Sequence, residues 1–181
     1  WIVDPLDGTI NYVHGLPAFA VSIALEAEGQ LDCGVVFDPM ADECFSAISG
    51  GGAFLNGRPI RVSECVQMHD ALVGVSFGYE VHPQGPEVRR FVASLMASQA
   101  VRRLGAAALN LAYVAAGRLD AYSACSAKIW DVAAGILLIQ EAGGVVTSIE
   151  GGTFRLDRPD FASAATPSLH RELLEILARA E

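Results

Sequence analysis

The hydrophobic pattern of the first third of the chain predicts a series of short antiparallel strands. Trp1–Val3 is apolar and β-favouring, and it leads into a polar loop over Asp4–Asn11. Three longer strands are predicted next: Phe19–Glu28, Leu31–Phe37 and Glu43–Ile48. Asn56-Gly57, between Ala53–Leu55 and Ile60–Val62, is a strong hairpin signal. The pattern therefore indicates an antiparallel meander.

From about residue 71 the pattern changes, and strands alternate with helices. The predicted strands are Ala71–Phe77, Leu119–Tyr122, Val145–Ser148 and Phe161–Ala164. The predicted helices are Pro86–Ser98, Ala106–Ala116, Ile129–Ala142 and Ser168–Ala180, the last capped by Thr166 or Ser168. We therefore expect one α/β domain over residues 1–181, with a mostly antiparallel sheet in 1–84 and an α/β layer in 85–181.

Composition narrows the classes of function. The chain has 181 residues, of which 52% are hydrophobic and 18% charged, which is typical of a compact globular domain. Its net charge of -9 argues against a nucleic-acid partner, because binding to phosphates in nucleic acids normally requires a basic surface. An acidic chain can still bind a phosphorylated small molecule if metal ions supply the positive charge.

The four cysteines and the apolar runs bear on the compartment. None of the cysteines forms a CxxC pair, and no histidine stands at zinc-ligand spacing from them. We predict reduced, mostly buried thiols in a cytoplasmic protein. No apolar run is long enough to cross a membrane, so we expect no membrane association. His69, His82 and His170 stand in polar surroundings and are predicted to lie on the surface.

The candidate chemistry begins at Asp4-Pro5-Leu6-Asp7-Gly8-Thr9. Two carboxylates stand three positions apart, Pro5 stiffens the loop, and Gly8 permits a tight bend. Carboxylates and free carbonyls at a strand end are hard oxygen ligands of the kind that Mg²⁺ prefers. The alternative is an Asx-type turn, and local spacing does not separate the two readings.

A second segment, Trp130-Asp131, opens a predicted helix in which Asp131 alone reads as a first-turn carboxylate. Together, Asp4–Thr9 and Trp130–Gly135 followed by Glu141–Gly144 resemble the two signature motifs of the inositol monophosphatase family. The resemblance extends over nearly the whole chain through further segments: Asn11–Pro17, Asp38–Met40, Gly52–Gly57 and Gly105–Asn110.

The resemblance implies a layered α/β/α/β/α fold, a homodimer, and phosphatase activity that uses Mg²⁺. By motif, Asp4 would bridge two metals, the Leu6 carbonyl would contact one, and Asp7 and Asp131 would hold the second. Asp4 and Thr9 would be catalytic, with Thr9 positioning the attacking water. Most of the residues that would bind the substrate belong to the same motifs: Asp7, Gly8, Thr9, Ala107 and Asp131.

Three departures from the family pattern affect this expectation. A Glu-Glu motif upstream of the first signature would supply a further metal ligand, and nothing precedes Trp1, so we expect the N-terminal segment to be missing. A Glu that contacts the inositol ring in many members is replaced by Ala124. Lys128, three residues before Asp131, either attracts a charged substrate or is a surface lysine. Apart from these departures, Arg102-Arg103 either binds a second phosphate or pairs with acidic neighbours.

We therefore predict Mg²⁺-dependent hydrolysis of a small phosphate monoester, with myo-inositol monophosphate as the first candidate. Histidinol phosphate, fructose bisphosphate and a nucleotide 3'-phosphate remain open alternatives. A non-catalytic binding or regulatory relative is the alternative from a different class.

Overall fold

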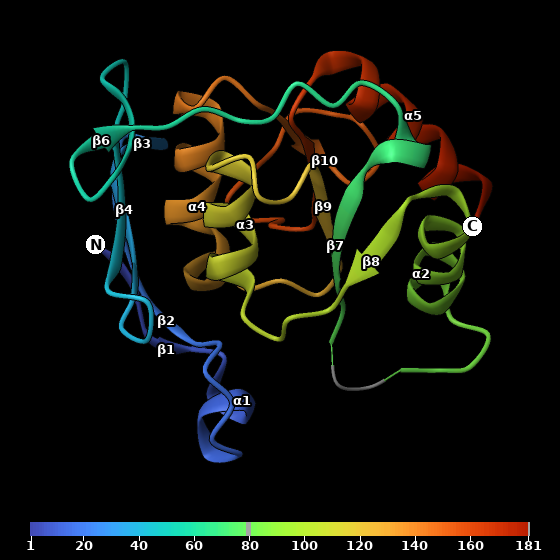
Figure 1. Ribbon diagram of the computed structural model, residues 1–181, viewed down its shortest axis with the longest axis horizontal. Coiled ribbons are helices and arrows are strands. Elements are labelled where there is room, and N and C mark those ends of the chain that lie inside the picture. Colours follow the sequence, from blue (N-terminus) through green and yellow to red (C-terminus); the bar gives the residue numbers. More distant parts are fainter. Residues whose placement is uncertain (79–80, 181) are drawn as a thin grey trace.

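The computed structural model describes residues 1–78 and 81–180, and its elements stack in layers (Figure 1). A six-stranded sheet, a pair of helices, a five-stranded sheet and a second pair of helices follow one another across the molecule. The predicted layered α/β class is confirmed. The described residues form four of the five layers that the resemblance implies, since no helix among them covers the outer face of the six-stranded sheet (Figure 1).

The six-stranded sheet is an antiparallel meander in chain order. Its strands are β1 (Ile2–Asp7), β2 (Ala20–Ala27), β3 (Gln30–Asp38), β4 (Glu43–Ile48), β5 (Gly52–Leu55) and β6 (Arg58–Pro59). Two boundaries were predicted wrongly. The strand β1 continues through the expected polar loop, because Pro5 is tolerated on an edge strand, and the helix α1 (Thr9–Val13) follows it. The hairpin at Asn56-Gly57 is present, but its second strand is Arg58–Pro59 and not Ile60–Val62.

The five-stranded sheet mixes parallel and antiparallel pairs in the order β10-β11-β9-β7-β8. Its strands are β7 (Leu72–Ser76), β8 (Ala100–Arg102), β9 (Ala121–Ala124), β10 (Val145–Ser148) and β11 (Phe161–Ala164). Sequence reasoning missed β8 and the short helix η1 (Met68–Asp70), and it placed β9 two residues too early. Both β8 and β9 run parallel to β7, so the carboxyl ends of these three strands meet at one edge.

The helices lie in two pairs. The pair α3 (Ala107–Ala115) and α4 (Ile129–Glu141) lies between the sheets, and the pair α2 (Pro86–Ala97) and α5 (Pro167–Arg179) covers the far face of the second sheet (Figure 1). Thr166 caps α5, since its hydroxyl accepts a hydrogen bond of 3.3 Å from the Leu169 N–H. Eight consecutive residues of α4, Val132–Ile139, are buried, because protein surrounds this helix on nearly every side.

Two glycines allow the central helices and the first sheet to approach closely. A Cβ atom on Gly135 of α4 would lie 2.3 Å from the Cβ of Leu111 on α3. A Cβ atom on Gly34 of β3 would lie 2.9 Å from the Cα of Ala134. Real Cβ atoms do not approach other heavy atoms this closely. The position of α4, and of every residue at its N-terminus, therefore depends on these two small residues.

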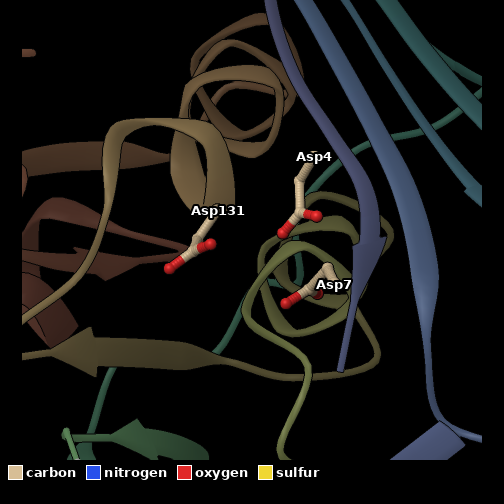
Figure 2. A group of neighbouring side chains, drawn as sticks. All are labelled: Asp4, Asp7 and Asp131. Carbon is tan, nitrogen blue, oxygen red and sulfur yellow. The ribbon is translucent and has the colours of Figure 1, made fainter. Parts of the chain in front are cut away.

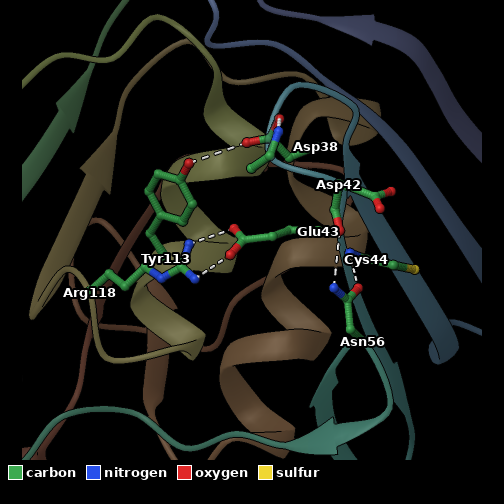
Figure 3. A network of polar contacts seen from close by, with 8 residues as sticks. Asp38, Asp42, Glu43, Cys44, Asn56, Tyr113 and Arg118 are labelled. Carbon is green, nitrogen blue, oxygen red and sulfur yellow. Dashed lines mark hydrogen bonds and ion pairs between the residues drawn. The ribbon is translucent and has the colours of Figure 1, made fainter.

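A polar network joins the meander to α3 away from the central helix (Figure 3). The Arg118 guanidinium donates two hydrogen bonds to the Glu43 carboxylate, at 2.5 and 2.6 Å, and holds the pKa of that carboxyl below its usual value. Tyr113 donates its hydroxyl to Asp38 at 3.4 Å. The Asn56 side-chain oxygen accepts a hydrogen bond of 2.8 Å from the Cys44 N–H of β4. These contacts fix the strand ends at the border of the core, where Asp38 is buried and Tyr113 packs on Phe45.

Two further predictions about burial are corrected. His170 is buried and not on the surface, with Nε2 3.1 Å from the Thr147 hydroxyl and 3.3 Å from the Ala162 carbonyl. Its burial lowers the pKa of the imidazole. The four cysteines are free, as predicted, but they are half-buried and not mostly buried: Cys33, Cys44, Cys65 and Cys125. Among the described residues, no helix is long and apolar enough to span a bilayer.

We predict that Gly135→Ala destabilises the protein by about 2 kcal/mol, because the added methyl group overlaps Leu111. Intrinsic helix propensity alone predicts the opposite sign, a gain of about 1 kcal/mol. Gln140→Ala, at an exposed position of the same helix, is the matched control and should change the free energy of unfolding by less than about 0.5 kcal/mol. Urea unfolding measures both changes, and a stabilised Gly135→Ala variant would contradict the close packing.

Candidate functional site

A cavity of about 820 Å³ lies where the two sheets and the two central helices come together. The ends of β1, β7 and β9, the loop after β8 and the first turns of α3 and α4 contribute its walls. Because three parallel strands end here, the cavity stands at the edge of the sheet where α/β proteins usually bind ligands. Its lining includes most of the residues that the sequence singled out: Asp4, Leu6, Asp7, Gly8, Thr9, Ala107 and Asp131.

Three carboxylates converge in this cavity from distant parts of the chain. Asp4 and Asp7 come from β1, and Asp131 comes from the first turn of α4 (Figure 2). One oxygen from each carboxylate lies within 4.8 Å of the others. This separation suits a shared cation, and like charges this close repel one another without one.

The backbone around Asp4 is held by local hydrogen bonds. The Leu6 N–H donates to Asp4 Oδ1 at 2.9 Å, and the Thr9 hydroxyl donates to the Leu6 carbonyl at 3.0 Å. The pairing of β1 with β2 is irregular between Asp4 and Asp7. The irregularity allows both carboxylates to reach the same cavity although they stand three positions apart in a strand, where alternate side chains would point to opposite faces.

Gly8 and Asn11 fix the turn that follows β1. Gly8 has φ of 84°, and a Cβ there would lie 2.7 Å from the Ala18 carbonyl oxygen, so both its conformation and its surroundings require glycine. The buried Asn11 side chain donates from Nδ2 to the carbonyls of Ala18 and Leu104, each at 2.7 Å. These bonds attach the carboxylate loop to the segment that leads into α3.

Asp7 is the most enclosed of the three carboxylates, with an exposed fraction of 6%. Its two oxygens accept hydrogen bonds from the first N–H groups of α3, Ala107 at 3.1 Å and Ala108 at 2.8 Å. Burial nevertheless raises the pKa of Asp7 to about 7, and the nearby charges of Asp131 and Asp4 act in the same direction. The two N–H groups oppose this increase and keep the side chain in place.

Asp131 occupies the first turn of α4, where its Oδ2 accepts a hydrogen bond of 3.1 Å from the Lys128 N–H. Burial raises the pKa of this carboxyl, the neighbouring Asp4 raises it further, and the Lys128 ammonium lowers it. Asp131 therefore lies in the first turn of its helix, as predicted, and also converges with the two carboxylates of β1. The helix N-terminus fixes the carboxylate, and the cavity determines what it faces.

The donor set fits a hard divalent cation. Three carboxylates lie close together, and burial, with a smaller effect of their mutual repulsion, raises the pKa of two of them, so a cation in the cluster would stabilise the charged forms. Oxygen-only ligands of this kind suit Mg²⁺, Mn²⁺ or Ca²⁺ better than softer metals. The observed cluster contains every carboxylate that the sequence assigned to a metal, and the Leu6 carbonyl lies in the same cavity.

Ala107 lines the cavity, but its N–H group is already bonded to Asp7. Thr9 is exposed, with its hydroxyl on the Leu6 carbonyl. His14 ends α1, is exposed and stands outside the lining. The structure thus places the two signature segments together, and it leaves the roles of Thr9, Gly8 and Ala107 toward a substrate as predictions.

Other cavity residues were not assigned to the site from sequence. They come from the ends of the parallel strands and the loops that follow them: Ser76, Phe77, Gly78, Tyr122, Cys125 and Ser126. No local motif marks them. The available signal was topological, because a ligand cavity is expected where parallel strands end, but β8 was missed and so the parallel set was not recognised.

Comparison with known proteins agrees with this geometry. The family model described as the inositol monophosphatase family matches residues 1–181. The chain is 44% identical over 180 residues to an inositol-1-monophosphatase of Mesorhizobium japonicum, which covers 99% of this chain and 67% of the relative. It is 43% identical over 169 residues to the Nus factor SuhB of Pseudomonas aeruginosa, covering 92% of this chain and 62% of that protein. The chain thus spans two thirds or less of the length of these relatives.

Solved structures show the same similarity in three dimensions. An inositol monophosphatase from Anabaena superposes with a TM-score of 0.93 at 39% identity, covering 99% of this chain and 71% of that one. The extragenic suppressor protein suhB of Bartonella henselae superposes with a TM-score of 0.91 at 41% identity, covering 97% and 67%. With the full-length family match and the carboxylate cavity formed from both signature segments, this chain belongs to the inositol monophosphatase family.

Proposed function

We propose that this protein hydrolyses a small phosphate monoester with Mg²⁺ as its cofactor, and that myo-inositol monophosphate is the first substrate to test. The observation that carries the proposal is the convergence of Asp4, Asp7 and Asp131 in one cavity. Membership of the family and the names of relatives such as the Mesorhizobium japonicum inositol-1-monophosphatase support the substrate class.

In this proposal the carboxylates hold the metal ions that the reaction needs. Asp4 would be shared between two Mg²⁺ ions, the Leu6 carbonyl would contact one of them, and Asp7 and Asp131 would hold the second. Bound Mg²⁺ lowers the pKa of a water molecule and neutralises charge on the phosphate and the leaving oxygen. Hydrogen bonds to Asp7 and Asp131 from α3 and α4 keep those carboxylates in place before the substrate arrives.

The remaining groups position the reactants. The Thr9 hydroxyl, which donates to the Leu6 carbonyl, is close enough to the carboxylate loop to orient the attacking water. The backbone N–H groups of Gly8 and Thr9 are proposed to face the phosphate, and Ala107 to contact the alcohol part of the ester. Since water is the nucleophile, the reaction needs no Ser, Cys or His side chain, and positioning with electrostatic stabilisation does most of the work.

Other substrates in the same class remain alternatives, namely histidinol phosphate, fructose bisphosphate and a nucleotide 3'-phosphate. These substrates are retained because Ala124 replaces a carboxylate that contacts the inositol ring in many family members. A regulatory relative without turnover is the alternative from another class. The relatives named Nus factor SuhB give that alternative a specific reason.

We also propose that the protein is a cytoplasmic homodimer without nucleic-acid or membrane partners. The family resemblance supports the dimer, and the four free cysteines are compatible with a reducing compartment. The net charge of -9 disfavours direct phosphate-backbone contacts with nucleic acid.

We predict that Asp4→Asn reduces kcat/KM for myo-inositol 1-phosphate by at least about a hundredfold, because the variant loses the carboxylate that would hold both ions. Phosphate release by the wild-type protein and by each variant is measured with Mg²⁺ and with a chelator. Asp32→Asn, on an exposed position of β3, is the matched control and should retain activity.

Full activity of Asp4→Asn would refute the assignment of this residue even if the phosphatase activity itself were confirmed. Absence of Mg²⁺-dependent turnover with every ester named above would instead favour the regulatory alternative. The two results can be told apart, because the assignment of Asp4 is tested only if the wild-type protein is active.

We predict that Mg²⁺ binding releases close to one proton at pH 6.5 and much less at pH 8.5. In the metal-free protein the pKa of Asp7 is about 7, so this carboxyl is largely protonated at the lower pH, and the cation competes with its proton. Apparent Mg²⁺ affinity should therefore rise with pH up to about 7 and then level off. Calorimetric titration in two buffers of different ionisation enthalpy counts the protons.

In the Asp7→Asn variant the pH-dependent proton release should disappear, whereas Asp32→Asn should retain it. Equal affinity at both pH values in the wild-type protein would show that Asp7 is ionised throughout this range. It would also mean that no proton on Asp7 competes with the cation in this range.

A further inference from the structure

The cavity carries cationic side chains as well as the carboxylate cluster. Arg103, in the loop after β8, and Lys128, just before α4, both line it. The chain as a whole is strongly acidic, with 12 Lys and Arg residues against 21 Asp and Glu residues. Two cations in the cavity wall are therefore a local feature and not the result of a generally basic surface.

Arg103 is held at the wall by Phe77, which follows β7. Its guanidinium carbon lies 4.6 Å from the centre of the Phe77 ring, and its Nη2 donates to the Phe77 carbonyl at 3.2 Å. Phe77 in turn packs edge-to-face on Phe91 of α2, with ring centres 6.0 Å apart. The guanidinium is thus placed by two packed rings, and the bond to the Phe77 carbonyl uses one of its five N–H donors.

Neither cation is neutralised by a neighbouring carboxylate in the part of the chain that the structure describes. The ion pairs of residues 1–78 and 81–180 involve other basic side chains: His69, Arg118, Arg155 and Arg179. The expectation that Arg103 pairs with an acidic neighbour is therefore not met, and the side chain faces the cavity. Lys128 donates its backbone N–H to Asp131 at 3.1 Å, and both this bond and the ammonium charge lower the pKa of that carboxyl.

Ala124 lies in the same wall, at the end of β9, and is 2% exposed. A methyl group there neither accepts a hydrogen bond from a substrate hydroxyl nor repels an anion. The cavity lining thus combines two positive charges with an apolar position where a carboxylate would have opposed them.

We propose that Arg103 and Lys128 form a subsite for a second anionic group, so that the preferred substrates carry a carboxylate or phosphate in addition to the phosphate ester that is cleaved. This inference rests on the proposed function, in which the cleaved phosphate lies at the carboxylate cluster. A guanidinium with free N–H donors in a planar fork matches a carboxylate or phosphate in two-point contact. The ammonium of Lys128 adds a second, more mobile charge.

The overall charge makes the sign of the effect informative. A protein of net charge -9 repels an additional negative charge on its ligand, so without a cationic subsite the anionic member of a matched pair would be the poorer substrate. A preference for the anionic member therefore requires local attraction that exceeds this general repulsion.

The test compares esters that differ only in the second group. Glycerol 3-phosphate and 3-phosphoglycerate differ by a hydroxymethyl group against a carboxylate, and fructose 1-phosphate and fructose 1,6-bisphosphate differ by a distant phosphate. For each pair we measure kcat/KM for release of the common phosphate with Mg²⁺, and we identify the product from the bisphosphate. The two pairs place the second anionic group at different distances from the cleaved phosphate. Both are used because the subsite would bind an anion only at the distance that separates it from the carboxylate cluster.

For at least one pair, we expect kcat/KM to be about fivefold higher for the anionic member, the size of a single well-placed exposed charge pair. In Arg103→Met this ratio should fall to about one or below, mainly through KM, and Lys128→Met should lower it less. The ratio is taken within each variant, so an effect common to both substrates cancels. Arg102→Met is the matched control, because the adjacent Arg102 side chain is exposed and stands outside the cavity lining.

A wild-type ratio of one or less for both pairs, with Mg²⁺-dependent hydrolysis of glycerol 3-phosphate and fructose 1-phosphate, would overturn the subsite and leave the proposed function intact. An unchanged ratio in Arg103→Met would also overturn it. If no ester is hydrolysed, the proposed function fails, and the subsite is tested by the dissociation constants of the same four compounds with Mg²⁺ present. Equal constants within both pairs would then exclude it.

Discussion

The structure depends on bringing three like charges into one small space. One oxygen of each of Asp4, Asp7 and Asp131 lies within 4.8 Å of the others, although the residues come from an edge strand and from a helix far along the chain. Burial and mutual repulsion raise the pKa of Asp7 and Asp131, so the metal-free arrangement is unfavourable for the charged forms. A divalent cation would reverse that balance, and this is the physical reason for the proposal that the cluster binds metal.

The rest of the fold holds the two halves of this cluster against each other. The central helix α4 carries Asp131 and lies between the sheets, where Gly135 and Gly34 allow α3 and β3 to approach it closely. The first N–H groups of α3 bind Asp7, and Asn11 ties the same loop to the segment before α3. A displacement of α4 would therefore change the separation of the carboxylates directly, and stability and site geometry are linked through the same contacts.

Much of this could be predicted from sequence, for reasons that differ between elements. The meander strands and the helix containing Asp131 have strong periodicity and clear turn residues, and the signature segments identified the carboxylates. The strand β8, only Ala100–Arg102, is too short to show periodicity, and without it the parallel edge of the second sheet and its cavity residues were not foreseen. His170 was placed on the surface because its sequence neighbours are polar, whereas its helix face packs on β11. The β1 strand was ended too early because Pro5 and two aspartates suggest a loop.

The cavity extends from the carboxylate cluster to Arg103, which rests on the Phe77 ring. In the proposed function the cleaved phosphate lies at the cluster, and the proposed subsite binds a second anionic group. The central claim is that the carboxylates bind divalent cations. Anomalous diffraction from crystals of the protein soaked in Mn²⁺, which resembles Mg²⁺ in its preference for oxygen ligands, tests it most directly. We predict anomalous peaks in the cavity, with Asp4 in contact with more than one ion and with Asp7 and Asp131 as ligands. Ordered carboxylates without any peak between them, at saturating Mn²⁺ and pH 8, would contradict the account.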